Sequence, residues 1–340
     1  MREDYKRYIE QLKKISTINP NRFYIYEDIS ADTFNDFYNF FRENLNSNEF
    51  GIEPAYFYFI DDNNINALAT PPNDGFYLIG ISKGLIEIFE RKFITYFDIN
   101  FFKNFKDVLT LHNKLPDCIG KLMYHDLVLF TYFHEFGHLI QFSSDRSSIE
   151  KEEKLSGAGT YSIEDHVFEL DADSFAAICI SSYFIRYLEI NNIELSSMEI
   201  KFHLSLILSS LFIYFFSFDE FEENLYFEKY SHPHPLIRGI NAVQQITTYV
   251  KDDLNERIPN LKLEEEDIFM ETFSLTRALA NETSDKQKMD KFIFCMENYS
   301  KELINYHNKL ITLVKDNPHS AVNVWNKTVF NGNRESVKSR

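Results

Sequence analysis

Hydrophobic residues recur at helical spacing near both ends of the chain. In residues 3–15 and 31–45, this spacing places apolar residues on one helix face and polar residues on the other, which predicts two amphipathic helices. The same spacing between 263 and 317 predicts further amphipathic helices. His307 lies within this region and His319 just after it, and we expect both on the surface. These segments indicate packing and carry no recognisable chemistry.

Short apolar runs bounded by turn residues predict a small sheet. Residues 55–60 are aromatic and end at an Asp-Asp-Asn-Asn turn, which is typical of a strand. Residues 66–69 and 76–82 flank a turn of Pro, Asn, Asp and Gly, which predicts a β-hairpin, and a helix begins at 84–89. An ordinary structural sheet explains this pattern. The functional alternative is that one sheet edge pairs with the backbone of an extended peptide, through Asn66, Ala67 and Leu68.

Longer apolar stretches predict buried helices. Residues 121–142 have helical length and few helix breakers. Residues 202–218 contain no Lys, Arg, Asp or Glu, and their length equals that of the shortest membrane spans, which is about 17 residues. This stretch also contains His203 and several serines, so we favour a buried core helix over a span. Residues 93–115 are aromatic without a clear period and are predicted to be helical up to Pro116.

The stretch 121–142 contains an HExxH motif formed by His134, Glu135 and His138. Residues four apart lie on one face of a helix, so the two imidazoles can bind one metal ion. Glu135 lies on a neighbouring side, where a carboxylate can act as general base toward water. Two His ligands and a carboxylate base are typical of zinc hydrolases. The alternative is a core helix that carries two incidental histidines.

A second helix supplies candidates for a third ligand. Residues 143–160 are polar and predict a loop, after which a new helix begins with acidic residues in its first turn. We favour Glu169 as the third ligand, with Asp173 one turn later accepting the spare N–H of a ligand histidine. Asp171 and His166 are rival ligands. A solvated acidic face is the alternative, but it accounts poorly for carboxylates among Leu, Ala and Phe.

A rigid histidine-containing loop follows further along the chain. In the sequence Ser-His-Pro-His-Pro after Tyr230, two prolines prevent a helix until Leu236, from which a helix runs to about Val250. A histidine held on a rigid loop is suited to donate a hydrogen bond to a developing oxyanion. A solvent-facing turn explains the spacing equally well.

Composition and charge reduce the number of functional classes to which the chain can belong. The 340 residues include 34 Phe and 20 Tyr, which is enough apolar surface for a sizeable core. The net charge of −17 disfavours binding to nucleic acid or to anionic membranes. Cys118, Cys179 and Cys295 are far apart, which argues against a disulfide framework and against a cysteine-ligated zinc site. The charged start lacks a secretory h-region, so we expect a cytoplasmic protein.

These patterns divide the chain into four segments. We assign an N-terminal helical segment to 1–50 and a metallopeptidase core to 51–255. C-terminal helices occupy 256–318, and a polar tail occupies 319–340.

Several motifs occur in one order along the chain. Asn66-Ala67 precedes a strand, HEFGH begins at His134, ELDADSFA begins at Glu169, and SHPHPLIR begins at Ser231. This set resembles the gluzincin-type zinc peptidases related to HtpX and the CAAX prenyl endopeptidases. The soluble Lit-type phage-exclusion peptidases carry a similar set. The resemblance covers about 65–245 and is most specific at HEFGH and ELDAD.

The resemblance implies an α+β, mainly helical fold with a zincin-like core: a small sheet, the HExxH helix and a second ligand helix. It implies Zn²⁺ held by His134, His138 and Glu169, with Glu135 as catalytic base. It further implies that His232 assists the oxyanion, that Asp173 orients a ligand, and that Arg238 braces the loop or Asp173. The membrane members carry additional hydrophobic helices, whereas this chain has one borderline segment, which favours a soluble relative.

We therefore expect a zinc-dependent endopeptidase that hydrolyses peptide bonds of one or a few intracellular proteins. The Lit resemblance suggests a role in phage defence or stress response, with a regulatory protein partner. The alternatives are a membrane-associated zinc protease acting on membrane or lipidated proteins, and a catalytically silent binding protein with the same fold. No nucleic-acid partner and no membrane partner are expected.

Overall fold

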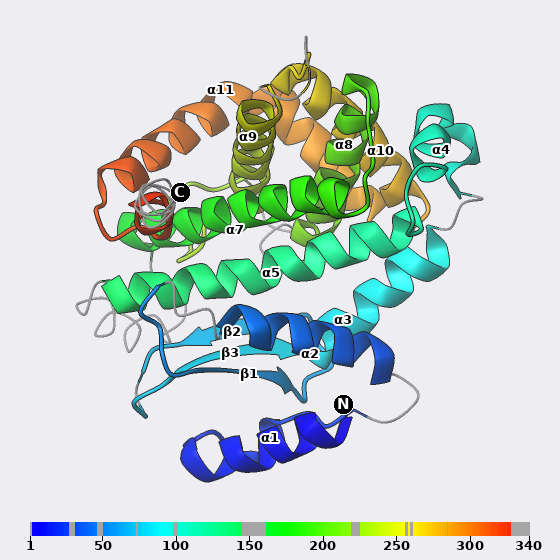
Figure 1. Cartoon of the computed structure of the whole chain (residues 1–340). Coiled ribbons are helices and arrows are strands. Elements are labelled where there is room, and N and C mark those ends of the chain that lie inside the picture. Colours follow the sequence, from blue (N-terminus) through cyan, green and yellow to red (C-terminus); the bar gives the residue numbers. More distant parts are fainter. Residues whose placement is uncertain are drawn as a thin grey trace, which may run out of the picture. The chain divides into compact units, whose positions relative to one another are not determined.

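The structure is a computed structural model that describes residues 2–26, 31–45, 50–72, 74–97, 101–144, 161–218, 225–255, 258, 261–283 and 285–327. These residues are mostly helical and include a single sheet of three strands, in agreement with the predicted α+β, mainly helical fold (Figure 1). The α-helices are α1 (Arg2–Ile15), α2 (Ala31–Leu45), α3 (Lys83–Glu90), α4 (Lys106–His112), α5 (Ile119–Ser144), α7 (Ile163–Ile190), α8 (Ser197–Phe215), α9 (Pro235–Leu254), α10 (Glu265–Asn281) and α11 (Lys286–Asp316). The strands are β1 (Ala55–Ile60), β2 (Ala67–Thr70) and β3 (Tyr77–Ser82).

The chain forms two compact units that interleave along the sequence. Unit 1 comprises 1–88, 131–158 and 315–340, and unit 2 comprises 89–130 and 159–314. The division falls within α5, so the HExxH part of this helix belongs to unit 1. The four segments expected from composition stay predictions.

Unit 1 contains the sheet, whose strand order is β1-β3-β2. The predicted hairpin is confirmed, because β2 and β3 pair antiparallel with Leu68 opposite Gly80. β1 pairs parallel with β3, with Phe57 opposite Ile79. Gly84, at the start of α3, is needed because a Cβ there would lie 2.3 Å from the backbone of Asn63. The chain can therefore leave β3 and enter α3 without a clash.

Aromatic residues join the sheet of unit 1 to α2 and to the HExxH part of α5. Phe57 on β1 lies 4.7 Å from Phe41 on α2 and 6.4 Å from Tyr132 on α5, measured between ring centroids. Phe41 and Tyr132 stack at 4.1 Å, and the Tyr132 hydroxyl donates a 3.1 Å hydrogen bond to the Phe41 carbonyl. Buried aromatic pairs of this kind add about 0.5–1.5 kcal/mol each beyond their area. The helix turn before His134 is therefore anchored on the sheet.

The outer edge of β1 is occupied by α1 and by the segment that follows it. The hydroxyl of Tyr8 accepts a hydrogen bond from Phe57 N at 2.8 Å, and the hydroxyl of Tyr5 accepts one from Phe59 N at 3.1 Å. Tyr24 N donates to Phe59 O at 2.8 Å. By contrast, in the described part of the chain β2 pairs with β3 alone, and all of its residues are half-buried. In the described residues, one edge of the sheet is therefore occupied, whereas the other is formed by the half-buried strand β2.

Unit 2 is helical, with α7 packed against α9 and α8 packed against α9 and α10. Nearly every residue of α8 is buried, and Ser196 and Glu199 form a capping box at its start. Ser205 and Ser209 donate to carbonyls one turn earlier in α8 and also approach carbonyls of α10 at 3.4 and 3.2 Å. Among the described helices, α8 alone has the length and apolar composition of a membrane span, and 89% of its most apolar stretch is buried. These contacts agree with a core helix.

Some expectations were wrong or only partly right. Residues 93–115 form no continuous helix: a π-helical turn (Arg91–Tyr96), a 3₁₀ turn (Phe101–Asn104) and the short α4 replace it. Without an apolar period, this stretch has no single face to bury. The predicted 143–160 loop lies outside the described residues beyond Ser144, and so does the predicted tail beyond 327.

His307 also departs from expectation. It is 2% exposed, whereas His319 lies at the surface as expected. On α11 its neighbours Leu303, Tyr306 and Leu310 are buried too, so the helix turns this face inward. α11 leaves helical geometry once, at Tyr299, where φ is −132° and ψ is 15°. The part of α11 after this kink carries His307.

The pH dependence of stability should report on His203, whose pKa burial lowers to about 3 from 6.5. Below about pH 6.5 the unfolded chain takes up the proton first, so this group destabilises the fold as the pH falls and has no effect above that range. We expect about 2 kcal/mol of unfolding free energy to be lost from this group between pH 7 and pH 5. Urea unfolding at both pH values measures the loss.

The matched variant is His203→Leu, which should lack this part of the pH dependence. Burial raises the pKa of Asp126 to about 7, which opposes the histidine effect. That contribution is common to both proteins and cancels in the comparison. A variant with the same pH dependence as the wild type would show that His203 is not the group responsible.

Candidate metal centre

α5 presents the two histidines of HExxH to one another, as the spacing predicted. The Nε2 atoms of His134 and His138 lie 3.1 Å apart, and the two rings are nearly perpendicular at 86°. Both side chains are buried, and so is Glu135. Two ligand nitrogens in a tetrahedral zinc site lie about 3.4 Å apart when each Zn–N bond is about 2.1 Å. The histidine pair is therefore close to the spacing that a shared metal ion requires.

Gln141 orients the ring of His138. His138 Nδ1 lies 2.8 Å from Gln141 Oε1, and an amide oxygen can only accept a hydrogen bond. Nδ1 therefore carries the proton, and in the neutral ring Nε2 keeps its lone pair for a metal. Sequence reasoning missed Gln141. A polar residue three positions after a ligand on the same helix was the signal that could have identified it.

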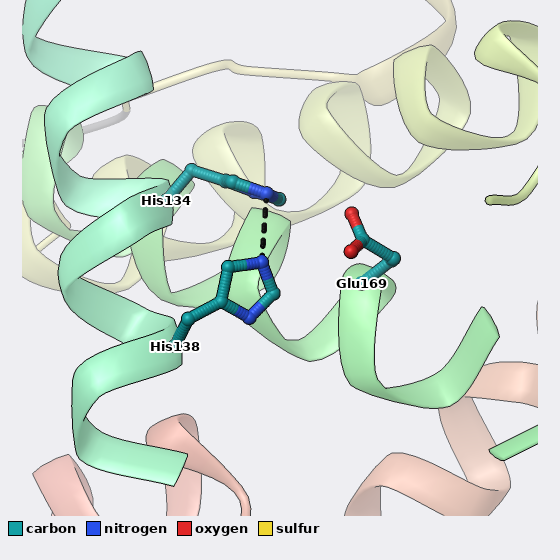
Figure 2. Close-up of side chains that lie close together, drawn as sticks. All are labelled: His134, His138 and Glu169. Atoms are coloured by element: carbon teal, nitrogen blue, oxygen red, sulfur yellow. Dashed lines mark hydrogen bonds between the residues drawn. The ribbon is translucent and has the colours of Figure 1, made fainter. Parts of the chain in front are cut away.

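Glu169, at the start of α7, completes a group of three ligand atoms. One carboxylate oxygen and one nitrogen from each of His134 and His138 all lie within 4.8 Å of one another. Figure 2 shows the three side chains facing a common point. Two imidazole nitrogens and a carboxylate oxygen are the donor set of many catalytic zinc sites. This chemistry fits a divalent metal. Among the described residues, no other group of three His, Cys, Asp or Glu side chains is placed so that it could hold a metal ion.

The rival ligand His166 is engaged elsewhere. Its Nε2 lies 2.8 Å from the Tyr230 carbonyl oxygen, and its Nδ1 lies 3.0 Å from the Tyr306 hydroxyl. Both ring nitrogens therefore have protein partners. Asp171 is 1% exposed and is not a member of the described group of ligand atoms. Of the candidates considered for the third ligand, Glu169 is the one that the structure places with the histidines.

Asp173 binds Arg238 in a buried bidentate ion pair. Arg238 Nε and Nη2 each donate a 2.7 Å hydrogen bond to a different oxygen of the Asp173 carboxylate. The guanidinium also lies 5.3 Å from the rings of Phe215 and Phe218. Although burial lowers the pKa of Arg238, the Asp173 carboxylate raises it above its ordinary value. The contact between Arg238 and Asp173 is therefore present, and the contact of Asp173 with a ligand histidine stays a prediction.

The loop between Tyr230 and α9 places its two histidines differently. His232 is half-exposed, with Nε2 3.5 Å from Glu169 Oε1 and Nδ1 3.1 Å from the Ser231 hydroxyl. His234 is buried and caps α9, because its Nδ1 accepts a hydrogen bond from Leu236 N. Burial lowers the pKa of His234 to about 3. His232 is therefore the histidine of this loop that approaches the ligand group.

The three residues predicted to bind substrate lie on or next to β2, the edge strand opposite β1 in the sheet. Ala67 and Leu68 belong to β2, and Asn66 directly precedes it. Asn66 O accepts a hydrogen bond from Ser82 N, and Asn66 N donates to the Ser82 hydroxyl. The start of β2 is thus fixed to β3, which keeps the strand extended.

Comparison with models of known families, with curated proteins and with solved structures finds no match to this chain. The resemblance inferred from the motifs therefore depends on the residues themselves and on the positions described above.

Breaking the Arg238–Asp173 pair should destabilise the fold strongly. Arg238→Met leaves a buried carboxylate without its cation, and we expect a loss of roughly 3–5 kcal/mol in unfolding free energy. The double variant Arg238→Met with Asp173→Leu removes both charges and should lose much less. Urea unfolding of the single and double variants measures this difference. Losses that simply add would show that the two side chains contribute independently.

Proposed function

We propose that this protein is a zinc-dependent endopeptidase with a zincin-like core. The observation that supports this most directly is the group of ligand atoms from His134, His138 and Glu169, which lie within 4.8 Å of one another. When bound, zinc supplies Lewis acidity, which polarises a carbonyl group and makes water a nucleophile near neutral pH. The chain supplies the ligands, the base and the surface for the substrate.

Glu135 is the proposed general base. It follows the first ligand directly on α5 and is buried, next to the group of ligand atoms. It takes a proton from the attacking water and delivers it to the nitrogen of the leaving amine. His232 is the proposed oxyanion donor, because it combines exposure with a 3.5 Å approach to Glu169. Arg238 and Asp173 hold α9 and α7 together behind these groups.

The substrate is proposed to be an extended peptide paired with β2. The asymmetry of the sheet edges supports this, because the tyrosines of α1 occupy the edge of β1, whereas β2 is half-buried and pairs with β3 alone among the described residues. A peptide that adds to a sheet edge binds through its main chain, so Asn66, Ala67 and Leu68 contribute position and little side-chain selectivity. Selectivity then requires other surfaces. We therefore propose cleavage of one or a few intracellular proteins in the cytoplasm, in phage defence or a stress response, under control of a protein partner.

Metal analysis tests the centre. We expect one zinc per chain in protein purified without added metal, and loss of zinc in His134→Ala, His138→Ala and Glu169→Ala. Glu135→Gln should retain zinc and lose hydrolysis, since it removes the base and no ligand. Asp171→Ala is the matched control and should also retain zinc. Elemental analysis of the wild type, the five single variants and the double variant His134→Ala with His138→Ala decides the point. Full zinc content in the double variant would contradict the site.

Proteome-wide cleavage tests the reaction. Wild type and Glu135→Gln are expressed in matched cells, and new protein N-termini are compared by mass spectrometry. We expect a few strong sites that occur with the wild type alone. Hundreds of sites would contradict narrow specificity. An absence of sites in every growth and infection condition would favour a catalytically silent binding protein.

A further inference from the structure

Two consecutive buried residues of α11 make contacts with other helices: Tyr306 contacts α7 directly, and His307 contacts Asn241 of α9, which in turn contacts α7. The Tyr306 hydroxyl lies 3.0 Å from His166 Nδ1, one turn before Glu169 in the sequence of α7. His307 Nε2 lies 3.3 Å from Asn241 Oδ1. The amide nitrogen of Asn241 in turn approaches the Leu170 carbonyl, at 3.4 Å, and the Ser174 hydroxyl, at 3.0 Å. α11 therefore supports α7 before and after Glu169, although it contributes no ligand itself.

The contacts of His166 define the direction of its hydrogen bonds. The Tyr230 carbonyl oxygen accepts only, so His166 Nε2 must carry the proton. In a neutral ring Nδ1 is then an acceptor, and it accepts a hydrogen bond from the Tyr306 hydroxyl at 3.0 Å. Burial lowers the pKa of His166, which keeps the ring neutral at pH 7. The result is a directed chain from Tyr306 through His166 to the backbone of Tyr230.

This chain ends in the loop that carries His232. Tyr230, two residues earlier, is held by its carbonyl, and its ring packs edge-on against Tyr226 at 4.7 Å between centroids. At the other end, His234 caps α9 and packs against Tyr226 at 5.0 Å. Both ends of the short loop are therefore fixed, and the half-exposed His232 side chain between them lies 3.5 Å from Glu169.

We propose that Tyr306 and His166 are positioning residues that hold the loop of His232 in place for turnover. This inference rests on the proposed peptidase function of the site. Neither residue touches the reacting atoms: each acts through the backbone of Tyr230. Proximity effects are steep, and a displacement of about 1 Å of a catalytic group can cost on the order of 100-fold in rate. Through Tyr306, the C-terminal helix α11 thus contributes to turnover, although it lies outside the region that carries the motifs.

A double-mutant cycle separates positioning from general stability. Tyr306→Phe removes the hydroxyl that donates to His166 and keeps the aromatic packing. We expect kcat to fall on the order of 10-fold with KM and zinc content nearly unchanged, and to fall less than about 2-fold when His232→Ala is already present. An equal loss in both backgrounds would overturn the proposal, because it would show that Tyr306 acts without His232. Thr276→Val, which removes a buried hydroxyl bonded within α10, is the matched control and should leave kcat unchanged in either background.

A conservative variant tests His166 itself. Glutamine carries an amide N–H that can still reach the Tyr230 carbonyl, whereas leucine cannot donate. We expect His166→Gln to retain most of the turnover that His166→Leu loses. Equal loss in the two variants would show that the bond to Tyr230 is not what positions the loop.

Amide hydrogen exchange supplies a readout that does not depend on activity. In Tyr306→Phe, the amides of 226–236 should exchange at least several-fold faster than in the wild type, while Thr276→Val should leave them unchanged. Unchanged exchange in Tyr306→Phe overturns the positioning role, whatever the activity. If cleavage dependent on Glu135 is absent but exchange rises as expected, the proposed peptidase function fails and the structural hold on the loop stands.

Discussion

The buried ion pair between Arg238 and Asp173 is the interaction on which unit 2 depends most. It joins α9 to α7 with two 2.7 Å hydrogen bonds at a place where water is excluded. Glu169 lies one turn before Asp173 on the same face of α7, and the loop of His232 leads directly into Arg238. The proposed third ligand and the loop of His232 are therefore both carried by the two helices that this contact joins. Removing one charge alone affects both.

A pair of this kind is not retained for stability alone. Desolvating two charges costs several kcal/mol for each ion, and well-packed apolar residues of similar volume are often as stable. The pair also determines the orientation of the two helices. A planar guanidinium binds a carboxylate in one geometry, whereas an apolar contact such as Leu against Phe allows several relative orientations. The buried hydrogen bonds that His166 of α7 makes with the Tyr230 carbonyl, and that Asn241 of α9 makes with α7 and with His307, are directional in the same way. Together they define how α7 is oriented, and Glu169 with it.

The parts that were predictable from sequence are those determined by short-range spacing. HExxH predicted the pairing of His134 with His138 because four residues make about one helical turn. The hairpin followed from turn residues between two apolar runs. Gln141 has the same kind of short-range spacing and was overlooked. Tyr306 and the inward face of His307 were not predictable in this way, because each acquires its role from a contact between helices far apart in the sequence. The aromatic stretch 93–115 had no period, and its division into short turns depends on its surroundings.

The two edges of the sheet differ in their packing, a difference that residue spacing alone does not reveal. From sequence, the edge at Asn66, Ala67 and Leu68 was the predicted site of peptide pairing, and the occupation of the β1 edge was not foreseen. The hydroxyls of Tyr5 and Tyr8 occupy backbone N–H groups of β1, and the backbone of Tyr24 pairs with the same strand. An unpaired sheet edge favours aggregation, and the three contacts at β1 protect that edge. The edge strand β2, where peptide pairing is proposed, lies within the same unit as the two histidines of α5.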